Sequence, residues 1–140
     1  MRIDYAKIEP EFISRMRQLT GDLSQTALTP GLRALVELRV SQINHCSYCI
    51  HVHSAEARQA GEAPSRIEQI SDWHTCGLFT PREQAALAWA EALTRTGKIH
   101  DDEQDYAQLA VHFSEPEIVS LGLAVSLTNF WNRMAGGFRK

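Results

Sequence analysis

Hydrophobic and polar positions along this chain repeat with the three-to-four-residue period of helices, and the alternating pattern of strands does not recur. The clearest signal begins at Thr29-Pro30, where threonine is a favoured cap and proline a favoured first helical residue. An apolar stripe at helical spacing follows, made of Leu32, Leu35, Val36, Val40 and Ile43. This pattern predicts an amphipathic helix that starts at Pro30 and reaches Ile43.

Six further segments carry similar signals, with prolines or capping residues at their starts. We expect them to begin at Pro10, near Cys46, and at Pro64, Pro81, Asp101 and Glu115. Capping boxes are expected at Thr80-Pro81-Arg82-Glu83 and at Ser114-Glu115-Pro116-Glu117, and helix ends near Ala60 and at Gly97. The pattern favours an all-α fold: a compact bundle of about six to seven helices in a single domain over residues 1–140.

The last predicted helix, from about Glu115 to Met134, is apolar almost all round. Such a helix must be central in the fold or be covered by another subunit, because few of its faces suit water. We therefore expect a homo-oligomer. Residues 136–140, with their two glycines and terminal charges, are expected to form a loose tail.

Composition restricts the kind of protein. The formal net charge is −3, which gives no indication of a nucleic-acid or anionic-membrane surface. The start of the chain lacks the apolar run of a signal peptide, and no apolar segment is long enough to span a bilayer. Two of the three cysteines form a CxxC, a pattern that in a cytoplasmic protein indicates redox or metal chemistry. We therefore expect a cytoplasmic protein with no nucleic-acid or membrane partner.

Candidate chemistry is concentrated between residues 37 and 53. Cys46, Cys49 and His53 are spaced i, i+3 and i+7, so they share one face of the helix expected there. Both cysteines lie at its N-terminus, where free backbone N–H groups and the helix dipole favour a thiolate. Two thiols and an imidazole on one face can form a reversible disulfide with a proton carrier beside it.

A thiolate at this place can attack the O–O bond of a peroxide and become a sulfenic acid, which the second thiol converts to a disulfide. His53 can supply the proton that the leaving oxygen needs, or pass it on from Glu37, and Tyr48 can orient or relay. Glu37 lies beside the apolar stripe of the preceding helix. It can be partly buried at the edge of the core, or solvated and paired with Arg33.

Two other readings of these residues stay open. Cys46, Cys49 and His53 could be three ligands of a structural zinc ion, with His74 or Cys76 as the fourth, although the spacing of that second pair does not match the usual pattern. The residues could also be purely structural, as buried cysteines and a hydrogen-bonded histidine.

A longer signature surrounds these residues: Glu37-Leu38-Arg39-x-Ser41-Gln42-x-Asn44-x-Cys46-x-Tyr48-Cys49-x-x-x-His53. It resembles that of the alkylhydroperoxidase AhpD-like proteins within the carboxymuconolactone decarboxylase superfamily. The segments 83–94 and Asn129-x-Trp131-Asn132-Arg133 are also similar to small single-domain members. Founding AhpD proteins have a histidine where this chain has Tyr48, small relatives often have glycine in place of His45, and decarboxylase members typically lack the cysteine pair.

The resemblance implies an all-helical fold that assembles into homo-oligomers, commonly trimers or hexamers. It implies that Cys49 is the peroxidatic thiol, that Cys46 is its proton donor and resolving partner, and that Glu37 and His53 belong to a proton relay. The expected function is therefore a thiol peroxidase that reduces hydroperoxides through a redox-active Cys46–Cys49 disulfide.

We expect this enzyme to need no bound cofactor and no metal, and to be recycled by a dithiol or dihydrolipoyl-type reductant. Cys76 is expected to stay reduced. The alternative functions are a non-redox activity of the carboxymuconolactone decarboxylase type and a structural zinc-binding helical module.

Overall fold

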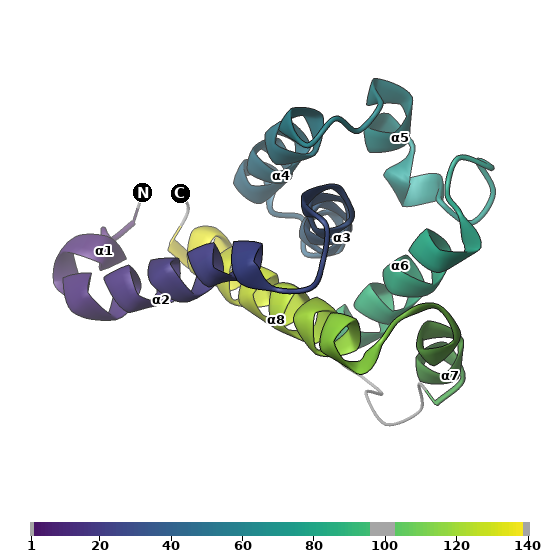
Figure 1. Cartoon of the computed structure of the whole chain (residues 1–140). Helices are drawn as coiled ribbons and strands as arrows, with labels where there is room; N and C mark the ends of the chain where they lie inside the picture. The colour runs from purple at the N-terminus through teal and green to yellow at the C-terminus, as the bar shows by residue number, and fades with distance from the viewer. Residues whose placement is uncertain (1, 96–102, 139–140) are drawn as a thin grey trace.

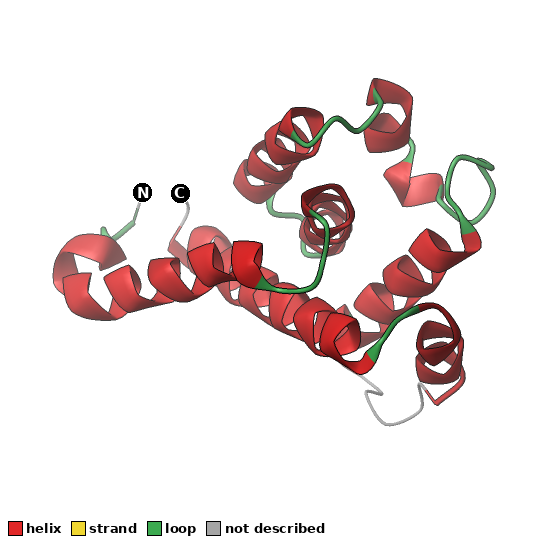
Figure 2. Cartoon of the chain, in the orientation of Figure 1, coloured by secondary structure: helices red, strands yellow, loops and turns green. Residues whose placement is uncertain are grey.

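The computed structural model describes residues 2–95 and 103–138, and this part of the chain is helical with no strand (Figure 2). The predicted all-α fold is confirmed, and it has one single-turn helix, α1, that the sequence pattern did not indicate. The α-helices are α1 (Tyr5–Ile8), α2 (Pro10–Asp22), α3 (Pro30–Ile43), α4 (Ser47–Gln59), α5 (Pro64–Glu68), α6 (Pro81–Thr94), α7 (Glu103–His112) and α8 (Glu115–Phe138). Two short 3₁₀ helices, η1 (Leu23–Gln25) and η2 (Ile70–Asp72), connect them.

Helix α3 lies at the centre of the bundle, with α4, α6 and α8 around it (Figure 1). The predicted stripe is buried at Leu32, Leu35, Val36 and Val40 and partly buried at Ile43. Residues on its other faces are buried too, including Ala34, Leu38 and Ser41. This central helix therefore contacts neighbours on all sides, and any polar group on it must find its partners inside the protein.

Helix α8 buries only part of its apolar surface within the chain. Leu121, Ala124 and Val125 are buried, whereas Val119 and Leu123 are 61% and 48% exposed. In Figure 1, α8 runs along one side of the bundle and α2 lies beside it. The helix is therefore not enclosed by its own chain.

The predicted caps follow from local chemistry. Thr80 and Glu83 form both halves of a capping box at the start of α6. Thr29 is the N-cap of α3 and Pro30 its first residue, although the threonine side chain makes no capping hydrogen bond. The start of each of these helices depends on a few neighbouring residues, so it could be predicted from the sequence.

The prediction of a loose tail is wrong for residues 136–138, because α8 continues to Phe138. The ring of Phe138 packs against the ring of Tyr5, with 5.3 Å between ring centroids. The backbone carbonyl of Phe138 accepts a hydrogen bond from the backbone N–H of Arg2. Contacts with the start of the chain therefore extend the helix. The expected helix end at Gly97 and start at Asp101 lie outside the described residues.

A polar network fixes the turn between α3 and α4. The side-chain amide of Asn44 donates to the Oδ1 atoms of Asn129 and Asn132 on α8, both at 2.9 Å, and Asn132 donates in turn to Ser41 on α3 at 3.1 Å. His45 has φ of 53°, in the left-handed region where glycine is normally found. This turn sets the position of the CxxC that follows it.

No helix in the described part of the chain is long and apolar enough to cross a membrane.

Candidate active site

The CxxC begins helix α4. Cys46 is the N-cap, and its sulfur accepts a hydrogen bond from the backbone N–H of Cys49 at 3.4 Å. The two residues are joined by a disulfide, with their Cα atoms 5.3 Å apart. Both are buried and form a small apolar cluster with Ala135 of α8. The free Cys76 packs instead against the main core.

A pocket of about 250 Å³ opens beside this disulfide. Helix α4 contributes Tyr48, Cys49 and His53 to its lining, and Trp131 and Ala135 of α8 form another wall. Cys46 does not line the pocket. A molecule bound there meets the Cys49 residue rather than the Cys46 residue.

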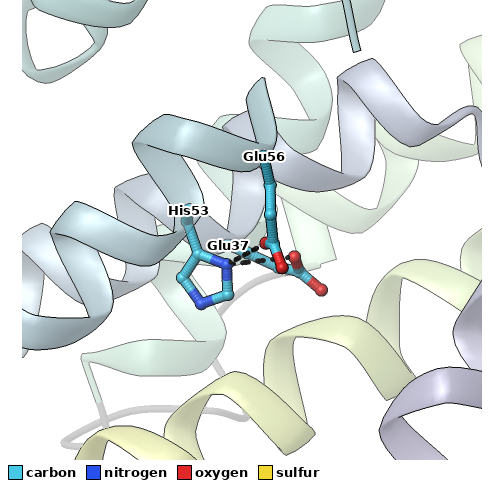
Figure 3. Close-up of side chains that lie close together, drawn as sticks. All are labelled: Glu37, His53 and Glu56. Carbon is cyan, nitrogen blue, oxygen red and sulfur yellow. Dashed lines mark hydrogen bonds and ion pairs between the residues drawn. The ribbon is translucent and has the colours of Figure 1, made fainter. Parts of the chain in front are cut away.

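His53 is held between two carboxylates (Figure 3). Its Nδ1 lies 2.7 Å from Oε2 of Glu56, three residues later on α4, and 3.4 Å from Oε2 of Glu37 on α3. In Figure 3 both carboxylates face the Nδ1 edge of the ring, and the other ring nitrogen points away from them. The two carboxylates differ in burial: the Glu37 side chain is 7% exposed and the Glu56 side chain 49%.

These carboxylates determine the charge of the imidazole. Burial lowers the pKa of His53, but the hydrogen bonds to Glu37 and Glu56 outweigh it and raise the pKa to about 9. The bond to His53 in turn lowers the pKa of Glu56. His53 is therefore a cation at neutral pH, with its Nδ1–H committed to the carboxylates and its Nε2–H available as a donor.

Of the two readings of Glu37 that the sequence left open, partial burial is right and solvation is wrong, although the pairing with Arg33 is present. The side chain is buried at the edge of the core, and its Oε1 lies 3.8 Å from Nε of Arg33, one turn earlier on α3. The contact with His53 crosses from α3 to α4, because the short turn between these helices folds them side by side. The structure thus brings Cys46, Cys49, His53 and Glu37 into one region, with Tyr48 43% exposed at the pocket.

Sequence reasoning missed Glu56 and the pocket walls. Glu56 lies at i+3 from His53, but such pairs are common on exposed helix faces and did not single it out. The pocket residues from α1, α2 and α8 carry no local signal, because only tertiary packing brings them to α4.

The zinc set considered from the sequence is not gathered. The Cys46 and Cys49 sulfurs are bonded to each other, and Cys76 belongs to a different cluster. His74 stacks on Trp73, with 3.5 Å between ring centroids, at a separate cavity.

Within residues 2–95 and 103–138, one group of three potential ligand atoms lies within 4.8 Å of one another: those of Glu37, His53 and Glu56. A metal ion there would have to displace the Nδ1 proton that both carboxylates share. It would also face the guanidinium of Arg33 beside Glu37.

A second buried carboxylate lies elsewhere, on α6. Oε1 of Glu91 accepts hydrogen bonds from Nε of Arg39 at 2.6 Å and from Nε1 of Trp73 at 2.9 Å, and Arg95 lies 3.3 Å from Oε2. Burial raises the pKa of Glu91, but the bonds from Trp73 and Arg39 outweigh it, so the net shift is downward. This carboxylate is a fixed anion that joins α3, α6 and the segment after η2.

This chain is similar in sequence to known proteins. A sequence model of the carboxymuconolactone decarboxylase family matches residues 10–92. The uncharacterized protein YdfG of Bacillus subtilis (strain 168) is 32% identical over 134 residues, which cover 96% of this chain and 91% of that protein.

Solved structures agree in fold. A protein of unknown function from Agrobacterium tumefaciens, named as a candidate antioxidant defence protein AhpD, is 34% identical with a TM-score of 0.94, over 99% of this chain and 95% of that one. The apo debrominase Bmp8 has a TM-score of 0.86 at 20% identity, over 96% of this chain and 72% of that one. At that identity the likeness shows the fold alone.

Proposed function

The chain belongs to the carboxymuconolactone decarboxylase family and has an AhpD-like fold, and from this premise we propose that it is a thiol peroxidase acting on hydroperoxides. One observation carries the proposal. Cys49 lines a pocket next to a cationic histidine, and it is already paired with Cys46 in a disulfide at the start of a helix. Decarboxylase chemistry would require neither the pair nor its position.

The first proposed step is attack by the Cys49 thiolate on the distal oxygen of the hydroperoxide. The O–O bond breaks, Cys49 becomes a sulfenic acid, and the departing alkoxide takes a proton and leaves as an alcohol. Position favours Cys49 for this role, because it lies in the first turn of α4 and lines the pocket, whereas Cys46 does not line the pocket.

In the second step the thiol of Cys46 attacks the sulfenic sulfur of Cys49, the disulfide forms and water leaves. A dithiol or dihydrolipoyl-type donor then reduces the disulfide by exchange, so two electrons pass from the donor to the peroxide. No cofactor and no metal take part. We place this cycle in the cytoplasm, where such donors keep thiols reduced.

His53 is the proposed proton donor to the alkoxide. Its cationic state at neutral pH follows from the two carboxylates, which hold Nδ1 and leave the opposite nitrogen of the ring free to donate. Glu37 and Glu56 act through the imidazole as positioning residues, and Tyr48 orients the substrate or relays a proton at the pocket.

Peroxide consumption with dithiothreitol or dihydrolipoamide tests the proposal. We expect turnover by the wild type, none by Cys49→Ser, and slower turnover by Cys46→Ser, whose sulfenic acid lacks the resolving thiol and can be reduced only by the external dithiol. Cys76→Ser is the matched control and should keep wild-type activity, since Cys76 packs in another cluster. Full turnover by Cys49→Ser would refute the mechanism, and inactivity of the wild type would favour a non-redox activity of the decarboxylase type.

We also propose that the protein is a homo-oligomer, with a trimer or hexamer as the expected form. The support is apolar surface left uncovered by the chain: Ile8, Phe12 and Val119 are 64%, 59% and 61% exposed. An apolar groove runs between α1, α2 and the end of α8. Light scattering should give a multiple of 15.8 kDa at micromolar concentration, and a particle of 15.8 kDa alone would exclude the oligomer.

A further inference from the structure

Arg17 of α2 brings a positive charge to the pocket that also contains Cys49 and His53. The side chain is exposed, and it makes no ion pair with any acidic group of the described residues. Arg15, on the same helix, lies 4.0 Å from Glu11 and at a different cavity. The charge of Arg17 is therefore left uncompensated, unlike that of its neighbour.

The other polar side chains of the pocket that have described contacts are already satisfied. Glu56 and His53 are bonded to each other. The hydroxyl of Thr20 donates to the carbonyl of Met16 and accepts from Nε1 of Trp131, both at 2.8 Å. Of the charged side chains that line the pocket, Arg17 is thus the one without a partner in residues 2–95 and 103–138.

Fixed aromatic rings form much of the remaining wall. Trp131 is held by its bond to Thr20 and by an edge-to-face contact with Phe130, with 5.0 Å between ring centroids. The ring of Tyr5, also on the pocket, packs against Phe138. Rings that are already ordered offer a flat apolar surface to an aryl or compact alkyl group at little entropic cost.

We propose that the pocket selects small organic hydroperoxides that carry a carboxylate, with Arg17 as the residue that recognises the anion. This inference rests on the proposed peroxidase function. A guanidinium pairs with a carboxylate through two parallel hydrogen bonds, so it fixes the orientation of the substrate as well as its charge. The apolar body then lies against Trp131 and Tyr5 and directs the hydroperoxide group to Cys49.

A matched pair of substrates tests the selection: cumene hydroperoxide and the same molecule with a para-carboxylate. We expect kcat/KM of the wild type to be about tenfold higher for the carboxylate, which is the scale of one charge-assisted hydrogen bond pair. In Arg17→Gln the ratio should fall to about one, with kcat/KM for cumene hydroperoxide unchanged. Arg15→Gln is the matched control and should keep the wild-type ratio.

A binding measurement separates this inference from the peroxidase function. Calorimetry with the two product alcohols, cumyl alcohol and its para-carboxylate, should show tighter binding of the carboxylate by the wild type and no difference in Arg17→Gln. Equal affinities in the wild type, or a preference that persists in Arg17→Gln, would overturn the inference and leave the peroxidase proposal standing. Arg17-dependent binding of the carboxylate without any peroxide turnover would uphold recognition of the anion and refute the peroxidase function.

Discussion

Glu37 lies on the central helix α3 and Glu91 on α6; both carboxylates are buried, but the groups around them differ. Their burial is nearly equal: Glu37 is 5% exposed and Glu91 is 6% exposed. Glu91 accepts two hydrogen bonds shorter than 3 Å, both from groups that do not lose their protons at physiological pH. The nearest partners of Glu37 are 3.4 Å and 3.8 Å away, and the nearer of them is a histidine that titrates.

This difference in partners distinguishes a carboxylate that stabilises the fold from one that can take part in a reaction. A carboxylate with fixed, permanently protonated donors stabilises one arrangement of helices and offers nothing to a reaction. A carboxylate held loosely beside an imidazole can change the charge of that ring, and through it the protonation of a substrate. Burial alone does not distinguish the two, but the partners do.

The largest expected effect concerns Glu91. We expect Glu91→Ala to lower the free energy of unfolding by about 3–5 kcal/mol, because it leaves the buried charge of Arg39 without its partner. Urea denaturation followed by circular dichroism measures this loss. Arg95→Gln, which removes the exposed partner of the same carboxylate, should cost less than about 1 kcal/mol. A Glu91→Ala protein as stable as the wild type would contradict the structural role that we assign to Glu91.

The next effect concerns pH. The pKa of His53 is raised to about 9 from 6.5, so its ion pairs contribute stability that is fully present below pH 6.5 and is lost as the pH rises through 9. The wild type should lose on the order of 3 kcal/mol more than His53→Gln over this interval. Urea midpoints of both proteins at several pH values from 6 to 10 test this. Parallel curves for the two proteins would show that the carboxylates do not hold the proton.

Replacing Glu37 should affect the rate more than the fold. We expect Glu37→Gln and His53→Gln each to reduce the peroxidase rate at least about tenfold, the cautious end of typical acid–base contributions. Their combination should be less than additive, because they act as one unit. The pKa of His53, followed by NMR, should fall in Glu37→Gln. A wild-type rate in Glu37→Gln with the fold intact would make Glu37 a second structural carboxylate like Glu91.

The smallest effect concerns the turn that joins the Glu37 helix to the His53 helix. His45 has φ of 53°, where a side chain is strained and glycine is not. His45→Gly should therefore raise the free energy of unfolding by up to about 1 kcal/mol and leave the peroxidase rate unchanged. A large loss of rate would mean that the His45 side chain takes part in the chemistry.

The sequence was informative where structure depends on near neighbours. The capping box of Thr80 and Glu83, the start of α3 at Pro30 and the CxxC at the start of α4 each follow from a few adjacent residues. The contact of Glu37 with His53 also depends on a short segment, because the turn between α3 and α4 folds the two helices side by side.

The rest depends on packing between distant segments. Arg17 and Trp131 line the same pocket although α2 and α8 are far apart in the sequence. The hydrophobic periodicity of either helix does not indicate that they share a pocket. The helical conformation of residues 136–138 depends on contacts with Arg2 and Tyr5, which outweigh the weak helix propensity of glycine. The contact of Glu56 with His53 was not predicted, because i, i+3 spacing alone does not show which residue a half-exposed glutamate binds.

The hydrogen bond from the Cys49 N–H to the Cys46 sulfur gives the protein a built-in spectroscopic reporter. The acceptor of this amide is a disulfide sulfur in the oxidised form and would be a thiol or thiolate in the reduced form, so the electron density at the acceptor changes with each redox cycle. The ¹⁵N resonance of that one amide should therefore register the oxidation state directly. Such a signal could be followed in a cell lysate, where consumption of added peroxide by other enzymes would obscure any activity measurement.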